Sequence, residues 1–245
     1  MATHVALDVT TWLGGYDLTG DSNQTQTTFE VDALEDTRFR MRGRSRVAGL
    51  ETATTSVSGF AVYGDGEVDD VAFDGLATAQ PLSQSVDGEE ESVAYFWQAR
   101  TFNYQTFGNV GELVPFSLSA QSGRGAGSVR TGGRVRGRVL KTNDAVVSAT
   151  GATGTAFELG EVDAGRYLYA AFHVFSAGAS ITAVLESDED DTFGSATTRM
   201  TFGPITAVGG VWGTRVAGPI TDTWYRLRVT AISGDFELAC VAGIK

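Results

Sequence analysis

The chain has 245 residues, 18 of them basic and 30 acidic, and a net charge of −12. Such an acidic chain repels phosphate backbones and anionic lipid surfaces, which argues against a dedicated DNA- or RNA-binding protein and against membrane association. A single cysteine excludes a disulfide framework and a cysteine-rich zinc site, and the sequence has no run of 18 apolar residues that would span a bilayer.

Alternation of polar and apolar residues predicts strands through most of the first 140 residues. In residues 25–32, Thr25, Thr27, Phe29 and Val31 point to one side and polar residues to the other, as in a half-buried strand. The aromatic segment 93–104 predicts a long strand buried on at least one face. Further strands are expected at residues 4–9, 53–63, 112–120 and 128–140.

One helix is predicted, at residues 67–77. Its apolar stripe consists of Val68, Val71, Ala72 and Leu76, and the acidic residues of its first turn suit the positive end of the helix dipole. The polar, acidic segment 83–91 is expected to be an exposed loop.

The composition shifts at residues 141–153 to Ala, Thr, Gly and Ser without large aromatics, which predicts a domain boundary. Downstream, strands follow at intervals of about ten residues with glycines at the turns, a spacing typical of a β-sandwich or jelly roll. We therefore expect an all-β chain with two domains, 1–145 and 146–245. The strands expected in the second domain lie at 155–162, 166–175, 180–186, 197–208, 212–217, 223–232 and 235–243.

Residues that could carry chemistry are few. His4 and His173 lie within expected strands, where a packed or solvent-facing histidine is favoured, and Cys240 lies in an apolar strand as a buried, inert thiol. The sequence contains no nucleophile-elbow, phosphate-binding or dinucleotide-binding motif. It predicts neither an enzyme nor a cofactor.

Two acidic clusters, Asp188–Asp191 and Asp65–Asp70, offer the oxygen ligands that calcium prefers. Neither has the spacing of a twelve-residue calcium loop, because the distal bidentate glutamate is missing. Solvated acidic loops are therefore favoured over metal sites.

The most informative charge pattern is basic, because arginine occupies every second position at Arg38, Arg40, Arg42, Arg44 and Arg46. In an extended strand all five would point the same way and repel one another, so an acidic partner is expected opposite them. In so acidic a protein, the natural partner is another copy of the chain. A solvated loop with weak ion pairs is the second interpretation and nucleic acid the third. A related spacing recurs at Arg130, Arg134, Arg136 and Arg138.

Several short motifs point to a family. They are Asp17–Asn23 (DLTGDSN), Ala33–Thr37, Arg46–Glu51, Thr54–Phe60 and Phe107–Phe116. Together they resemble the major tail tube proteins of long-tailed, non-contractile (siphovirus-type) phages over roughly residues 5–140. The remainder resembles the extra C-terminal β domain of some such tail proteins, through Leu168–Val174, Glu186–Asp188, Ile220–Arg226 and Val241–Ile244.

This resemblance implies a tail-tube-type β-sandwich with one short flanking helix, and a second β domain on the tube exterior. It implies homohexameric rings that stack into a tube, contacts with other tail proteins, and DNA that passes through the lumen without specific binding. The protein would be made in the host cytoplasm and reside in the virion tail. Such proteins carry a long loop or hairpin that reaches a neighbour where this chain carries its alternating arginines.

Two other classes remain open. A carbohydrate- or receptor-binding β-sandwich would use Trp212, Trp224 and Tyr225 as stacking platforms, although aromatics in strands more often belong to the core. A capsid-decoration or tail-fibre protein would form trimers or monomers rather than six-fold rings.

Overall fold

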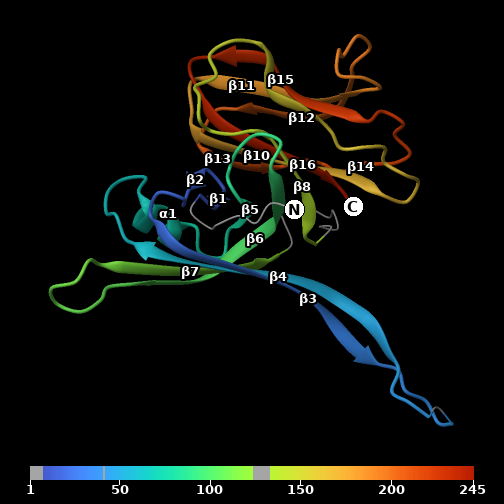
Figure 1. Ribbon diagram of the computed structural model, residues 1–245. Helices are drawn as coiled ribbons and strands as arrows, with labels where there is room; N and C mark the ends of the chain where they lie inside the picture. The colour runs from blue at the N-terminus through green and yellow to red at the C-terminus, as the bar shows by residue number, and fades with distance from the viewer. Residues whose placement is uncertain (1–7, 41, 124–132) are drawn as a thin grey trace.

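The computed structural model describes residues 8–40, 42–123 and 133–245 (Figure 1). These residues form strands and one short helix, which confirms the all-β prediction. The elements of the first half are β1 (Thr10–Leu13), β2 (Tyr16–Asp17), β3 (Ser22–Glu35), β4 (Arg46–Phe60), α1 (Val68–Asp74), β5 (Ala79–Ser85), β6 (Val93–Thr106), β7 (Pro115–Ser122) and β8 (Val135–Lys141). Those of the second half are β9 (Gly151–Glu158), β10 (Tyr167–Ser176), β11 (Ser180–Asp188), β12 (Thr197–Ile205), β13 (Gly209–Trp212), β14 (Val216–Ala217), β15 (Trp224–Ser233) and β16 (Glu237–Ile244).

The strands are arranged in a large branched sheet and a small four-stranded one. The main path of the large sheet is β13-β10-β16-β8-β6-β5-β1-β2, and β7, β4 and β3 branch from β6. The branch exists because one edge of β6 serves two partners: residues 93–96 pair with β8, and residues 99–106 pair with β7. The four-stranded sheet has the order β12-β11-β15-β9.

The centre of the molecule is a sheet buried on both faces, where β10 and β16 pair. On one face, Phe172 and Cys240 pack against the four-stranded sheet, with the Phe172 and Phe202 rings stacked at 5.1 Å. On the other face, Tyr169 and Val241 belong to a second core. This double burial explains why residues 168–174 show no polar–apolar alternation.

The predicted domain boundary at residue 145 lies between β8 and β9. The large sheet continues across it, because β8 pairs with β16 near the C-terminus. The second core also draws Trp12 and Phe96 from the first half and Tyr169 from the second. The two-domain division remains a prediction, and the hydrogen-bonded sheet does not break there.

His173 in β10 links the two halves of the chain. Its Nδ1 lies 2.7 Å from the Gly14 carbonyl oxygen and its Nε2 lies 2.8 Å from the Ser83 hydroxyl. Because a carbonyl oxygen only accepts, Nδ1 donates to Gly14, and in the neutral ring Nε2 accepts from the Ser83 hydroxyl. Burial lowers the pKa of His173 to about 4, although the Gly14 carbonyl and Asp17 act in the opposite direction. The histidine is therefore a packed strand residue, as favoured, whereas His4 lies outside the described residues.

Other predictions are confirmed or corrected element by element. Helix α1 lies within the predicted segment and buries Val68 and Ala72; it is the one helix of the described chain and is too short to cross a membrane. The first strand of the described residues begins at Thr10. Of the strand expected at residues 4–9, only residues 8 and 9 are described, and neither is in a strand. Strand β5 was not predicted, and its end at residues 83–85 is buried rather than an exposed loop.

Candidate assembly surfaces

The most conspicuous feature of the fold is a two-stranded arm that leaves the body (Figure 1). Strands β3 and β4 pair from Ser22 opposite Gly59 out to Glu35 opposite Arg46. Near the body β4 also pairs with β7, from Thr54 opposite Gln121 to Phe60 opposite Pro115. Beyond that point β4 pairs with β3 alone, so the arm is only two strands wide.

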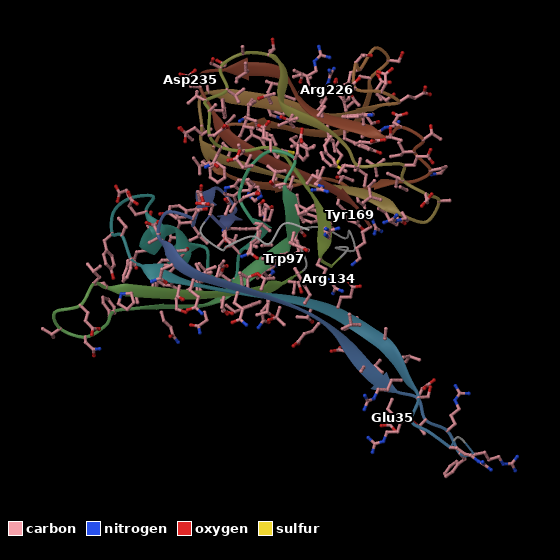
Figure 2. All side chains as sticks on the ribbon, viewed as in Figure 1. Glu35, Trp97, Arg134, Tyr169, Arg226 and Asp235 are labelled. Carbon is pink, nitrogen blue, oxygen red and sulfur yellow. The ribbon has the colours of Figure 1, made fainter. Side chains whose placement is uncertain are left out.

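The inner part of the arm is fixed to the body by aromatic packing. The Phe29 ring meets the Trp97 ring edge-on at 5.6 Å and lies 5.5 Å from the Tyr95 ring. The Arg134 guanidinium lies 5.5 Å from the centre of the Phe29 ring. Figure 2 shows Trp97 and Arg134 where the arm leaves the body. These contacts set the direction of the arm.

The outer part of the arm exposes apolar side chains. Leu34 and Val47 are cross-strand partners and both are exposed, and the nearby Leu50 has 77 % of its surface exposed. Val31 is exposed as well, and Phe39 in the tip loop is fully exposed. Within the described residues of one copy, nothing buries these side chains. Such exposure at the end of a projecting element is typical of a contact surface.

The tip of the arm, residues 36–46, carries the alternating arginines. Of these arginines only Arg46 lies in a strand, because residues 36–40 and 42–45 lie outside the strands. A hydrogen bond from the Asp36 amide to the Ser45 carbonyl, 3.1 Å, closes this loop. Arg40 has φ 78°, in the left-handed region, so the backbone turns sharply there. The idea of five arginines along one strand face is therefore wrong, and basic groups instead surround the tip (Figure 2). In the described ranges, no ion pair involves Arg40, Arg42 or Arg44.

The second set of arginines lies on the body and contacts its own chain. Arg134 lies 4.0 Å from a Glu51 carboxylate oxygen. Arg138 in β8 stacks over the Phe157 ring at 4.7 Å and donates to the Glu91 carbonyl, 3.0 Å. Arg136 lies on β8 opposite Tyr95, and Arg130 is outside the described residues. A role for Arg134, Arg136 and Arg138 between subunits remains a prediction.

One face of the sheet formed by β3, β4, β7 and β6 is exposed and polar. The cross-strand registers place Gln24 beside Ser58, Ser58 beside Ser117, and Ser117 beside Gln105. Apart from Glu30 and Arg100, the polar members of this face are Ser, Thr, Gln or Asn: Gln24, Gln26, Thr28, Thr52, Thr54, Ser56, Ser58, Asn103, Gln105, Ser117, Ser119 and Gln121. Beyond Ser58 and Ser117 the face continues to the apolar pair Phe60 and Pro115, and Phe102 is exposed at the β6 bulge. The opposite face packs on the core through Ala53 and Val57. The surface is hydrophilic but almost uncharged.

A second apolar surface lies around α1, at the end of the body away from the arm tip (Figure 1). We call it the far-end surface; it is formed by residues 60–63, by α1 and the residues up to Leu76, and by residues 101–114. The Ala61 amide donates to the Val114 carbonyl at 2.8 Å, the Tyr63 and Thr106 hydroxyls lie 2.7 Å apart, and Leu76 bridges Thr101. Its exposed apolar members are Phe60, Val62, Tyr63, Phe73, Leu76, Phe102, Phe107, Val110 and Leu113.

Exposed acidic residues lie on one part of the far-end surface, at α1. Asp65, Glu67 and Asp74 are exposed beside or on α1. Asp69 contacts its own chain, since its carboxylate accepts a hydrogen bond from the Tyr104 hydroxyl at 2.6 Å. Burial, together with this carboxylate, raises the pKa of Tyr104 to about 12. The sequence predicted the helix but not this surface, because its apolar residues come from segments that only the fold brings together.

The proposed aromatic platforms are largely part of the core. Tyr225 is completely buried, so its assignment to a surface is wrong; its hydroxyl donates to the Asp222 carbonyl at 3.1 Å. Trp212 is half-buried and packs at 5.6 Å from the Phe96 ring and 6.2 Å from the Tyr169 ring. Trp224 is half-buried at the start of β15. These three residues therefore do not form a platform on which a sugar could stack.

The acidic cluster Asp188–Asp191 and Cys240 are the remaining candidates, and contacts within the chain account for the side chains of Asp188, Asp190 and Cys240. Asp188 is buried and accepts the Glu189 and Ser195 amides at 2.7 and 2.8 Å, and Asp190 accepts the Thr192 amide at 2.9 Å. No group of three or more metal-ligating side chains occurs in the described part of the chain. Cys240 is enclosed in the core, and burial raises the pKa of its thiol.

No protein-family model and no curated protein matches the sequence. Among solved structures, a chain of the virion of a native gene transfer agent particle is 17% identical over 53% of this chain and 98% of its own, with a TM-score of 0.40. A chain of the tail of an empty gene transfer agent particle, refined helically with C6 symmetry, is 16% identical over 54% of this chain and 98% of its own, with a TM-score of 0.37. These TM-scores are too low to assign a function, so the function is argued from the geometry of the chain.

Proposed function

We propose that this protein is a structural component of a phage-like tail, in which copies assemble into stacked rings that form a tube for DNA. The observation that carries the proposal is the arm, a projecting ribbon whose outer apolar side chains one copy does not bury. A contact between the arm of one copy and a different surface of the next is heterologous, and such contacts close into rings or continue as filaments. We propose six-fold rings.

The polar face supports a role as a conduit wall. A basic wall would bind the phosphate backbone and stop its passage, whereas a strongly acidic wall would repel it. A face of hydroxyl and amide groups does neither and remains wetted. We propose that DNA passes without specific binding, through a lumen to which this face contributes.

The second half completes the proposal. We propose that residues 146–245 lie on the tube exterior, since their sandwich would obstruct a channel. The partners are then other copies of the chain and neighbouring tail proteins, and the location is the virion tail after synthesis in the host cytoplasm. The role assigned is structural, with no catalytic step and no cofactor.

Electron microscopy of the purified full-length protein, before and after concentration, tests the proposal. We expect rings or stacked tubes with six-fold averages and a central channel. Compact trimers without a channel would contradict it and favour a decoration or fibre protein.

A shortened arm provides the matched control. Replacing residues 36–45 by an Asn-Gly turn joins Glu35 to Arg46, which are already cross-strand partners, with the dipeptide that favours a tight hairpin. The body should fold unchanged, because none of the described residues among those removed belongs to the three cores. Rings and tubes should disappear.

A further inference from the structure

The arm and the far-end surface are complementary, which the proposed function leaves unexplained. The arm ends in arginines together with an exposed phenylalanine and two exposed aliphatic side chains, Leu34 and Val47. The far-end surface exposes apolar side chains next to the exposed acidic residues on and just before α1. We propose that the tip of the arm of one copy docks on the far-end surface of a second copy. This inference rests on the proposed function and names the surface that receives the arm.

Charge is the first argument. Residues 47–99 contain no lysine or arginine, and Asp65, Glu67, Asp69, Asp70 and Asp74 are concentrated around α1. The Arg100 guanidinium of β6 lies nearby, where it donates to the Ala77 carbonyl. Asp69 already pairs with Tyr104, but Asp65, Glu67 and Asp74 make no ion pair or side-chain hydrogen bond within the described ranges. The tip has the opposite charge, with five arginines and one aspartate in residues 36–46. Opposite potentials steer encounter and fix the orientation of a complex.

Apolar contact is the second argument, because charge alone would not distinguish this surface from other acidic loops. The acidic loop at 188–191 carries one aromatic neighbour, Phe193, which is buried under Arg226 at 4.1 Å. At the far-end surface, by contrast, Phe73 is 64 % exposed and Phe107 is 78 % exposed. Aromatic side chains and arginine are the residues enriched where interfaces bind most strongly.

Geometry is the third argument. The arm tip and α1 lie at opposite ends of the molecule (Figure 1), so one copy cannot satisfy both surfaces by itself. A contact between them leaves a free tip on one copy and a free far-end surface on the other. Growth can therefore continue by the same contact, as a heterologous interface requires.

Cross-linking tests the contact directly. Arg42→Cys combined with Asp74→Cys places thiols on the tip and on α1, and the enclosed Cys240 does not compete. Oxidised assemblies should give a ladder of disulfide-linked multimers. The control pair is Arg42→Cys with Asp235→Cys, an exposed site on the other half of the chain that Figure 2 labels. A ladder from the control pair and none from the α1 pair would overturn the inference.

Charge reversal provides the second test. Arg40→Glu/Arg42→Glu/Arg44→Glu should lower the sedimentable fraction at least about tenfold, and so should Asp65→Arg/Glu67→Arg/Asp74→Arg. The two triple variants mixed or combined should regain assembly, because the attraction is restored with its signs exchanged. All the exchanged side chains are exposed, so thermal unfolding of each monomer serves as the folding control.

The outcomes separate the two proposals. If the parent protein forms no rings or tubes, the proposed function fails and the inference fails with it. If the parent assembles and both reversed variants assemble equally well, only the inference fails. A third outcome is that the parent binds a DNA duplex, the tip variant does not, and the α1 variant assembles fully. This outcome would assign the tip to nucleic acid and would also overturn the docking inference.

Discussion

The arm and the central sheet are built from the same element, an antiparallel strand pair, and differ in what covers it. In β10, every residue from 168 to 174 is buried, and in β16 so is every residue from 238 to 243. In β3, every residue from 30 to 35 is exposed. The two pairs have similar hydrogen-bond ladders. The hydrogen-bond ladder is therefore common to the two strand pairs, and what distinguishes them is the burial of their side chains.

This difference separates folding from assembly within one chain. Burial of apolar surface is the dominant favourable contribution to folding, and the central sheet supplies it on both faces. The outer arm contributes little burial in a single copy. Substitutions in the two regions should therefore have opposite effects: core changes should unfold the monomer, and arm changes should leave it folded but unable to assemble.

The largest effect is expected from Phe172→Ala in β10. Removing a fully buried ring that stacks on Phe202 leaves a cavity in the sandwich core and should lower the free energy of unfolding by about 3–5 kcal/mol. Urea denaturation of the monomer measures it. A loss below about 1 kcal/mol would mean that the sandwich does not supply the stability assigned to it.

A smaller effect is expected from acid. The pKa of His173 is lowered to about 4 by burial, whereas an unfolded histidine has a pKa near 6.5. Between these values the unfolded chain binds a proton that the folded chain does not, so stability falls as the pH drops below about 6.5. The contribution at pH 4.5 is about 2–3 kcal/mol. Urea denaturation of the parent and of His173→Gln at several pH values between about 4.5 and 7 measures this contribution. The free energy of unfolding of the parent should fall more steeply with decreasing pH, and equal slopes would refute the prediction.

The smallest effect on the monomer is expected from the arm. Leu34→Ser and Leu50→Ser remove exposed side chains and should change the free energy of unfolding by less than about 0.5 kcal/mol. The same variants should lose sedimentable assemblies, since the apolar contact is removed. Ser56→Ala, on the polar face of the same hairpin, is the matched control and should assemble. Destabilised monomers would mean that the outer arm packs against its own chain.

Much of the body could be predicted from the sequence because its strands obey simple patterns. Alternation in residues 25–32 and the aromatic run at 93–104 both correspond to strands, and the apolar stripe of α1 packs inward at Val68 and Ala72. Strand β5 escaped prediction because three of its five buried residues, Ser83, Gln84 and Ser85, are polar. Gln84, for example, is satisfied by the Thr11 and Thr25 hydroxyls at 3.2 and 2.7 Å, and no local pattern reveals such distant partners.

The candidate surfaces were predictable only in part. The alternation of arginines drew attention to the segment that forms the tip of the arm but suggested the wrong conformation, because a two-residue period also occurs in a loop, where side chains point in several directions. The far-end surface could not be found from spacing, since Tyr63, Leu76 and Phe107 are brought together by tertiary contacts.

The two-strand width of the arm has a consequence for the accuracy of growth. An isolated two-stranded hairpin is marginally ordered in water, so docking must also fix the ribbon, and the entropy lost is subtracted from the contact energy. Under the proposed docking, each single event would then be weaker than its contact area suggests and readily reversible. A copy that arrived in the wrong orientation would dissociate before the next one covered it, and a long, regular polymer would correct its errors without any additional factor.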